Sequence, residues 1–286
     1  MSRIAYVNGR YVPHCSARVH VEDRGYQFAD GVYEVCEVRD GHLIDMRLHL
    51  DRLERSLAAL RMGSPMSRAA LERVLRETVR RNRVRNGQVY LQVTRGVAPR
   101  DQVFPPANTP PGIVVTARAL SDAARHKAAR DGIRVISLPD NRWERVDIKT
   151  VGLLPNVLAK QAAREAGAQE AWFVDADGFV TEGASSNAWI VTHEGTLVTR
   201  PAEHGILRGI TRTVLVEEAA ALGLALEERS FTLAEAHEAA EAFITAATAL
   251  VMPVIQLDGR RIGQGRPGPV ASRLRQRFHD FAEVSH

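Results

Sequence analysis

The sequence predicts an α+β protein with two domains. Its 286 residues, 45% of them hydrophobic, suffice for two medium domains with their own cores. Helical and strand-like patterns are mixed in both halves. A polar, basic stretch over residues 121–131 lies between the halves. We therefore expect an N-terminal α+β domain (1–120), a connector (121–131) and a C-terminal, β-rich α/β domain (132–286).

The first half begins with a predicted β-hairpin, because apolar residues flank the turn pair Asn8-Gly9. An irregular polar segment, 22–31, leads into an apolar strand over 32–38 that contains Cys36. Leu50, Leu53 and Leu57 recur at helical spacing. The remaining expected elements are a helix over 49–60, a helix to residue 79 capped by Ser67, strands over 89–94 and 113–117, and a long proline-rich loop over 95–111.

The second half opens with a predicted strand over 133–138. A glycine-containing turn joins the two strands in each of two expected strand pairs. Thr232 and Glu235 form a capping-box pattern. The expected elements are a helix over 157–166, strands over 171–174, 179–180, 188–191, 196–198, 242–245 and 251–257, and helices over 209–223 and 270–281.

Composition argues against several classes of protein. The net charge is +4, and arginines are spread among 34 acidic residues, so we expect no nucleic-acid partner. The basic run 80–85 ends a predicted helix and has no interleaved aromatic residues. No apolar run could span a bilayer and no signal core is present, so we expect no membrane partner. Cys15 and Cys36 suggest neither a metal site nor a disulfide framework, which favours the cytoplasm.

Lysine chemistry has only three candidates, Lys127, Lys149 and Lys160. A lysine amine attacks an aldehyde only when unprotonated, and apolar surroundings favour that form. Lys149 has Val146, Ile148 and Val151 beside it and sits at the end of a strand-like segment, whereas the other two lie in polar surroundings. Lys149 is therefore the preferred catalytic candidate; the alternative is an ordinary lysine extending from an apolar edge.

Five segments in order, spanning nearly the whole chain, resemble those of D-amino-acid transaminases, which are class IV, fold-type IV pyridoxal-phosphate enzymes. They are Glu22-Asp23-Arg24-Gly25-Tyr26-Gln27-Phe28-Ala29-Asp30-Gly31-Val32-Tyr33-Glu34, His49-Leu50-Asp51-Arg52-Leu53, Asp147-Ile148-Lys149, Thr181-Glu182-Gly183-Ala184-Ser185-Ser186-Asn187 and Leu207-Arg208-Gly209-Ile210-Thr211-Arg212. The resemblance implies a small N-terminal α/β domain and a larger C-terminal domain that carries the Schiff-base lysine.

By this resemblance Lys149 binds pyridoxal 5′-phosphate as a Schiff base, and Glu182 pairs with the pyridine nitrogen. An opposite charge there keeps the ring protonated, as the chemistry requires. Backbone N–H groups of Ile210 and Thr211 at a helix N-terminus suit a phosphate, and Arg52 can add a charged fork. Leu207 would pack against the ring. Ala247 would offer only its backbone where the family often has a hydroxyl.

The implied reaction is ping-pong transfer of an amino group between a D-amino acid, such as D-alanine or D-glutamate, and a 2-oxo acid. By resemblance Tyr33, Arg100 and Gln102 bind the substrate carboxylate, and the loop carrying Arg100 comes from the neighbouring subunit of a homodimer. Family members with D-specificity usually have histidine at position 102; glutamine is uncharged, which leaves the preferred substrate open.

The alternatives on the same fold are a branched-chain L-amino-acid transaminase, an R-selective amine transaminase and an aminodeoxychorismate lyase. The segments 24–28 and 99–101 favour D-amino acids over these. A nucleic-acid-binding protein and a non-catalytic relative are alternatives of other kinds. Retention of Lys149, Glu182 and Arg52 argues against the non-catalytic relative.

Overall fold

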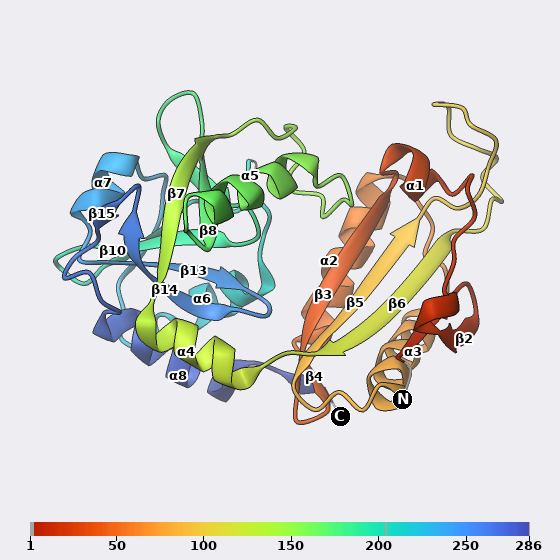
Figure 1. Cartoon of the computed structure of the whole chain (residues 1–286), viewed down its shortest axis with the longest axis horizontal. Coiled ribbons are helices and arrows are strands. Elements are labelled where there is room, and N and C mark those ends of the chain that lie inside the picture. Colours follow the sequence, from red (N-terminus) through yellow and green to blue (C-terminus); the bar gives the residue numbers. More distant parts are fainter. Residues whose placement is uncertain (1–2, 204, 286) are drawn as a thin grey trace. The chain divides into compact units, whose positions relative to one another are not determined.

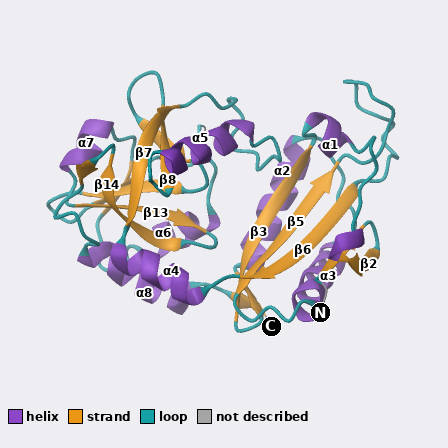
Figure 2. Cartoon of the chain, in the orientation of Figure 1, coloured by secondary structure: helices purple, strands orange, loops and turns teal. Residues whose placement is uncertain are grey.

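The computed structural model describes residues 3–203 and 205–285, and the chain divides into two compact units. The first unit comprises Met1–Ser121, Ile148–Gly152 and Glu283–His286, and the second comprises Asp122–Asp147 and Leu153–Ala282. Both units combine helices with a β-sheet (Figure 1 and Figure 2), so the predicted α+β class is confirmed.

The first unit is built on an antiparallel sheet, which has seven strands within the described residues. Its order is β16-β4-β3-β5-β6-β1-β2, and β3, β5 and β6 run side by side (Figure 1). Asn8 and Gly9 both have positive φ and form the predicted turn between β1 and β2. The strands are β1 (Ile4–Val7), β2 (Arg10–Pro13), β3 (Gly31–Arg39), β4 (His42–Ile44), β5 (Gly87–Thr94), β6 (Gly112–Ala119) and β16 (Val284–Ser285).

Two helices, α2 (Met46–Ala59) and α3 (Arg68–Arg81), supply the apolar partners of this sheet. Leu50, Leu53 and Leu57 of α2 join Val32 and Leu91 of the strands in one buried cluster. Side chains alternate between the two faces of a strand, so Tyr33 lies on the opposite face of the sheet from this cluster. The predicted N-cap is confirmed, since Ser67 Oγ accepts the N–H of Ala70. Short helices η1 (His14–Ser16) and α1 (Arg24–Phe28) complete the unit.

The second unit has a mixed sheet, nine-stranded in the part of the chain that is described, with the order β12-β11-β10-β13-β14-β7-β8-β9 and β15 paired to β14. Strands β7 and β8 are parallel and are connected through α5. The strands are β7 (Ile133–Pro139), β8 (Glu170–Val174), β9 (Val180–Gly183), β10 (Asn187–Val191), β11 (Leu197–Thr199), β12 (Leu226–Glu228), β13 (Glu241–Ala246), β14 (Leu250–Leu257) and β15 (Arg260–Arg261).

Helices and aromatic residues close the core of the second unit. Trp172 packs edge-on against Phe231, with ring centroids 6.1 Å apart, and both side chains are fully buried. The predicted capping box at Thr232 is present, with Glu235 as its partner. The helices are α4 (Asp122–Asp131), α5 (Leu154–Glu165), α6 (Ile210–Glu218), α7 (Leu233–Glu238) and α8 (Pro269–Phe281).

The structure differs from the expected domain organisation at three places. The C-terminal segment Glu283–His286, expected in the C-terminal domain, belongs to the first unit. Residues 122–131, expected to be a connector, form α4 and belong to the second unit. Lys149, expected in the C-terminal domain, belongs to the first unit, because its segment is bonded to the start of β3. The N–H of Tyr33 donates to the carbonyl of Lys149 (3.0 Å), and the N–H of Val151 donates to that of Gly31 (3.0 Å).

Three local expectations also need correction. Lys149 does not end a strand: only Thr150 next to it forms an isolated bridge, with Val32. The segment expected to be irregular before β3 contains α1, which Asp23 caps by accepting N–H groups of Gly25 and Tyr26. Helix α6 ends at Glu218 rather than near residue 223.

The two cysteines differ in their exposure. Cys15 is exposed and Cys36 is buried, and both are free thiols. Burial raises the pKa of the Cys36 thiol, which suits a packing role better than a reactive one. Within residues 3–203 and 205–285, no helix is both long enough and apolar enough to cross a membrane.

Candidate active site

The amine of Lys149 lies against the phenol of Tyr33. Its Nζ donates to the Tyr33 hydroxyl over 3.3 Å and is 4.3 Å from the centroid of the ring. The backbone bonds between their two segments fix Lys149 beside the start of β3. Both residues are half-buried, so the amine is in the first unit but not sealed in its core.

Two further polar residues share the strand face of Tyr33. Tyr90 stacks on Tyr33 with ring centroids 5.7 Å apart, and its hydroxyl donates to Gln92 Oε1 over 2.7 Å. Burial raises the pKa of Tyr90 to about 12, so this phenol stays protonated. The sequence analysis did not single out Tyr90 or Gln92. Alternation along the two strands could have placed Tyr33 and Val35 on one face and Tyr90 and Gln92 on one face. The register of the sheet, which pairs Tyr33 with Gln92 and Val35 with Tyr90, brings these residues to the same face.

Arg52 lies on the other side of β3, in a buried ion pair with Glu34. Its Nε donates to Glu34 Oε1 and its Nη2 to Oε2, both over 2.7 Å. Burial raises the pKa of Glu34, but the charge and hydrogen bonds of Arg52 outweigh burial and lower that pKa to about 2. His49 Nδ1 lies 2.7 Å from Glu34 Oε2. Burial lowers the pKa of His49, so its imidazole is neutral at neutral pH.

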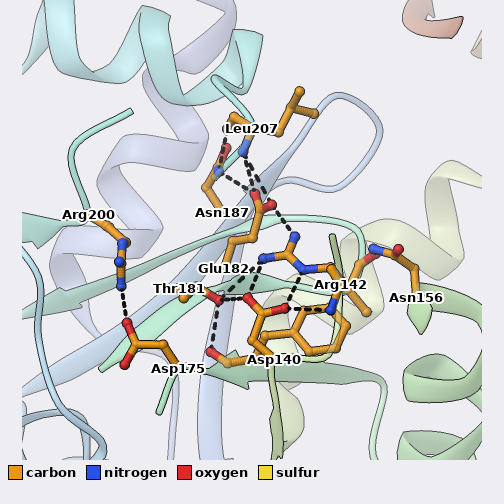
Figure 3. A network of polar contacts seen from close by, with 11 residues as sticks. Asp140, Arg142, Asn156, Asp175, Thr181, Glu182, Asn187, Arg200 and Leu207 are labelled. Atoms are coloured by element: carbon orange, nitrogen blue, oxygen red, sulfur yellow. Dashed lines mark hydrogen bonds and ion pairs between the residues drawn. The ribbon is translucent and has the colours of Figure 1, made fainter. Parts of the chain in front are cut away.

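Glu182 lies near the end of β9 in the second unit and is 5% exposed. Its carboxylate accepts donors on both oxygens: Arg142 Nη1 on Oε1, Asn187 Nδ2 on Oε2 (3.1 Å), and the Leu207 N–H at 3.2 Å from each (Figure 3). The predicted residues Glu182 and Leu207 are therefore in direct contact through the backbone of Leu207.

Arg142 was missed by the sequence analysis, although it contacts Glu182 directly. It also forms a fork with Asp140, through Nε to Oδ1 (2.9 Å) and Nη2 to Oδ2 (2.7 Å), and Thr181 Oγ1 donates to the same carboxylate over 2.8 Å (Figure 3). Burial raises the pKa of Asp140, but the hydrogen bonds and charge of Arg142 outweigh it and lower that pKa. Two carboxylates thus fix one guanidinium.

The N-terminus of α6 has the features of an anion site. Gly209 is its N-cap and no side chain caps it, while the first N–H groups of a helix have no partner within the helix. Ile210 and Thr211 follow and are 7% and 4% exposed. A Cβ at Gly209 would lie 2.1 Å from Asn187 Oδ1, so only glycine fits there. Asn187 also donates to the Leu207 carbonyl over 2.9 Å, which ties this loop to Glu182.

The remaining predicted residues lie apart from these contacts. Ala247 is in the turn between β13 and β14, in the second unit. Arg100 and Gln102 are exposed in the loop over 95–111 of the first unit, where the Arg100 guanidinium is 4.6 Å from the centroid of the Phe28 ring. In the described part of that unit, neither residue is hydrogen-bonded to Tyr33 or Lys149.

The first unit thus offers a half-buried lysine amine, and the second offers a buried carboxylate and the uncapped start of a helix. A family model for amino-transferase class IV matches residues 31–257, which is more than half of the chain. The chain therefore belongs to the class IV aminotransferase family.

Relatives and solved structures support this membership. The chain is 42% identical over 267 residues to a D-alanine aminotransferase of Bacillus licheniformis, covering 93% of each chain. It is 36% identical over 278 residues to one of Staphylococcus haemolyticus, covering 97% of each. A branched-chain aminotransferase of Thermoproteus uzoniensis, solved with norvaline, has a TM-score of 0.87 and 26% identity, covering 99% of both chains. A second branched-chain enzyme, solved with pyridoxamine 5′-phosphate, has a TM-score of 0.89 and 29% identity, covering 98% of this chain and 94% of that one.

Pyridoxal 5′-phosphate is the cofactor of this family, and the residues present fit it. The uncapped start of α6, where Gly209 leaves no room for a side chain, suits the phosphate. Glu182 is a buried carboxylate that accepts from Arg142, Asn187 and Leu207, which suits a ring N–H, and Lys149 offers a half-buried amine. These contacts lie in separate units, with Lys149 and Arg52 in the first and Glu182, Leu207, Ile210 and Thr211 in the second.

Proposed function

We propose that this chain is a D-amino-acid transaminase, which transfers the amino group between a D-amino acid such as D-alanine and a 2-oxo acid. The Lys149 amine on Tyr33, in a class IV aminotransferase, is the observation on which the proposal depends. Preference for D-amino acids is supported by relatives named D-alanine aminotransferase at 36% to 42% identity. The solved branched-chain enzymes share the fold but are less similar in sequence, at 26% to 29% identity, and therefore support the L-amino-acid alternative less strongly.

Bound pyridoxal phosphate supplies an electrophilic carbon and a cationic ring that takes up electrons. Lys149 would hold the cofactor through its amine and would move a proton at the substrate α-carbon, as base and then as acid. Tyr33 orients the Lys149 amine. Glu182 would keep the ring nitrogen protonated, and Arg142 and Asn187 hold that carboxylate in place. The two substrates react in turn, in a ping-pong cycle.

The proposal also names the residues that would bind the cofactor. Arg52 and the N–H groups of Ile210 and Thr211 would bind the phosphate. Leu207 would pack against the ring, and Ala247 would contribute backbone only, because it has no hydroxyl. The buried position of Arg52 and the absence of a side-chain cap on α6 support these roles.

The substrate carboxylate is assigned to Tyr33 with Arg100 and Gln102, the latter two from the neighbouring subunit of a homodimer. Two observations support a dimer. Arg100 is exposed and stacks on Phe28 rather than on Tyr33. Helix α5 exposes three apolar side chains within about one turn, Leu154 (69%), Val157 (58%) and Leu158 (58%), and a second copy would cover them.

Single-turnover half-reactions test the choice of substrate. The holoenzyme is mixed with D-alanine or with L-leucine in the absence of a 2-oxo acid, and the absorbance of the bound cofactor is followed. We expect rapid conversion with D-alanine only. Conversion with L-leucine alone would make the chain a branched-chain transaminase, the activity that the similar solved structures carry in their names. Conversion with neither would indicate an amine donor or a lyase.

We further propose that the enzyme works in a reducing cytoplasm, without nucleic acid or membrane as a partner. Its two free thiols support the reducing compartment. Fractionation of the native host would test this location.

A further inference from the structure

A buried ionic cluster, formed by Glu34, His49 and Arg52, lies on the helix side of β3. Glu34 and His49 are 2% exposed and Arg52 is 3% exposed, so bulk water does not hydrogen-bond to their polar atoms. Glu34 comes from β3, whereas His49 and Arg52 are one turn apart on α2. Around them the apolar core of the first unit includes Val32 and Leu53.

The bonds of the cluster fix the Arg52 guanidinium in one plane. Glu34 receives Nε on one oxygen and Nη2 on the other, both over 2.7 Å, which is the two-pronged geometry that only arginine can make. The Glu34 Oε2 atom is also 2.7 Å from His49 Nδ1. Since His49 is neutral, the natural assignment is an Nδ1–H that donates to Glu34, so the carboxylate is held from both sides.

Stability alone does not account for this arrangement. A buried ion pair must offset the desolvation of both charges, and apolar side chains of similar volume often stabilise a core as well or better. What the cluster provides is orientation, because the planar fork of an arginine on a carboxylate has one geometry, whereas a solvated arginine samples many rotamers. A fixed direction matters most where the same guanidinium has to bind a second anion.

We propose that Glu34 is the positioning residue for Arg52, that it sets the direction in which Arg52 meets the cofactor phosphate, and that His49 in turn orients Glu34. The inference rests on the proposed assignment of Arg52 to the phosphate. It predicts that the cluster controls the contribution of the phosphate group to cofactor affinity, and not the affinity for the rest of the cofactor.

Binding of two probes to the apoprotein tests this prediction: pyridoxal 5′-phosphate and pyridoxal, which lacks the phosphate. For Glu34→Gln we expect affinity for pyridoxal 5′-phosphate to fall roughly 10- to 100-fold, by analogy with the loss seen when the outer partners of metal-binding residues are removed. Affinity for pyridoxal should change by less than about twofold, because its contacts do not involve Arg52. His49→Gln should give a smaller loss, about threefold, with the same selectivity.

Asp30→Asn is the matched control. Asp30 is also a largely buried carboxylate of the first unit held by arginines, with Arg24 Nε at 2.9 Å and Arg95 Nε at 2.7 Å, but it does not contact Arg52. It should lower thermal stability as Glu34→Gln does, and leave the affinity for both probes unchanged. Should Glu34→Gln fail to fold, Glu34→Asp and His49→Gln provide the same ratio of affinities.

Arg52→Gln separates failure of this inference from failure of the proposed function. Loss of phosphate-dependent affinity in Arg52→Gln but not in Glu34→Gln would overturn the positioning role of Glu34 alone. Unchanged affinity in Arg52→Gln would instead remove Arg52 from the phosphate site. Equal losses for pyridoxal and its phosphate in Glu34→Gln would mean general damage to the pocket, and would also overturn the inference.

Discussion

Asn187 and Glu182 are bonded side chain to side chain, with Asn187 Nδ2 3.1 Å from Glu182 Oε2 (Figure 3). The same amide donates to the carbonyl of Leu207, so it connects the acid to the loop that begins α6. One residue thus links the two features of the second unit that suit the two ends of pyridoxal phosphate, the ring nitrogen and the phosphate.

Asn187→Ala should therefore weaken the binding of both the ring nitrogen and the phosphate of the cofactor. We expect kcat for the D-alanine half-reaction to fall about 10-fold, which corresponds to about 1.4 kcal/mol. We also expect weaker cofactor binding. Asn156→Ala is the control, since Asn156 donates to the Ala184 carbonyl over 2.9 Å without contacting Glu182. Equal effects of the two substitutions would contradict the linking role.

Lys149→Ala should abolish turnover, with a loss of at least about 10³-fold, because both the covalent link and the proton-transfer group are removed. Borohydride reduction of the wild-type holoenzyme followed by peptide mapping should find the cofactor on Lys149. Lys127→Ala and Lys160→Ala should stay active: Lys127 pairs with Asp131, and Lys160 donates to the Gln169 carbonyl over 2.7 Å. An adduct on either of these lysines would refute the assignment.

Paired subunit variants test the source of Arg100. Heterodimers of Lys149→Ala and Arg100→Ala chains can be isolated through two different affinity tags. If Arg100 acts on the neighbouring subunit, one of the two sites is intact and about half of the wild-type turnover should return. A loop that acts within its own chain would leave no intact site, and the isolated heterodimer would stay inactive.

Acid should destabilise the first unit in two steps set by the Glu34 cluster. The pKa of His49 is lowered from 6.5 in the fold, so its contribution to stability is lost as pH falls through 6.5, where the unfolded chain takes up a proton. The pKa of Glu34 is lowered from 4.5 to about 2, so its contribution is present above 4.5 and is lost as pH falls toward 2.

By linkage, the lowered pKa of Glu34 makes a pH-dependent contribution of about 3 kcal/mol to the free energy of unfolding. Urea unfolding of the apoprotein between pH 3 and pH 8 would measure the free energy of unfolding. The Glu34→Gln protein should lack the step below about pH 4.5 and unfold with a flatter pH dependence there. A wild-type curve that does not change between pH 7 and pH 4 would rule out this account.

Local patterns predicted those parts of the fold that local chemistry determines. The Asn8-Gly9 turn, the Ser67 cap and the Thr232 capping box are all confirmed, because each depends on residues within a few positions. Helix α4, expected to be a connector, was missed because its polar, basic sequence lacks an apolar stripe, and the helix buries only Ala129. The short helix α1 is set by a single cap at Asp23, which periodicity cannot detect in five residues.

Candidate site residues could be named from the sequence where their type or motif is distinctive, whereas their tertiary partners could not. Lys149 stood out by its apolar flanks, and Glu182 and Arg52 by their resemblance to family segments. Arg142 reaches Glu182 across 40 positions, and Glu34 reaches Arg52 across 18. No periodicity in the chain joins such pairs, so only the folded arrangement of β3 with α2, and of the segment after β7 with β9, reveals them.

The short segment Ile148–Gly152 determines how this chain can be cut into its two units. The polypeptide leaves the first unit after Ser121, returns for five residues that include Lys149, and returns again at Glu283 to add the edge strand β16. No single cut therefore yields either unit whole. A gene fragment that ends at residue 121 would encode neither Lys149 nor the last strand of its own sheet, so recombination between relatives must exchange three separate stretches together to transplant the first unit.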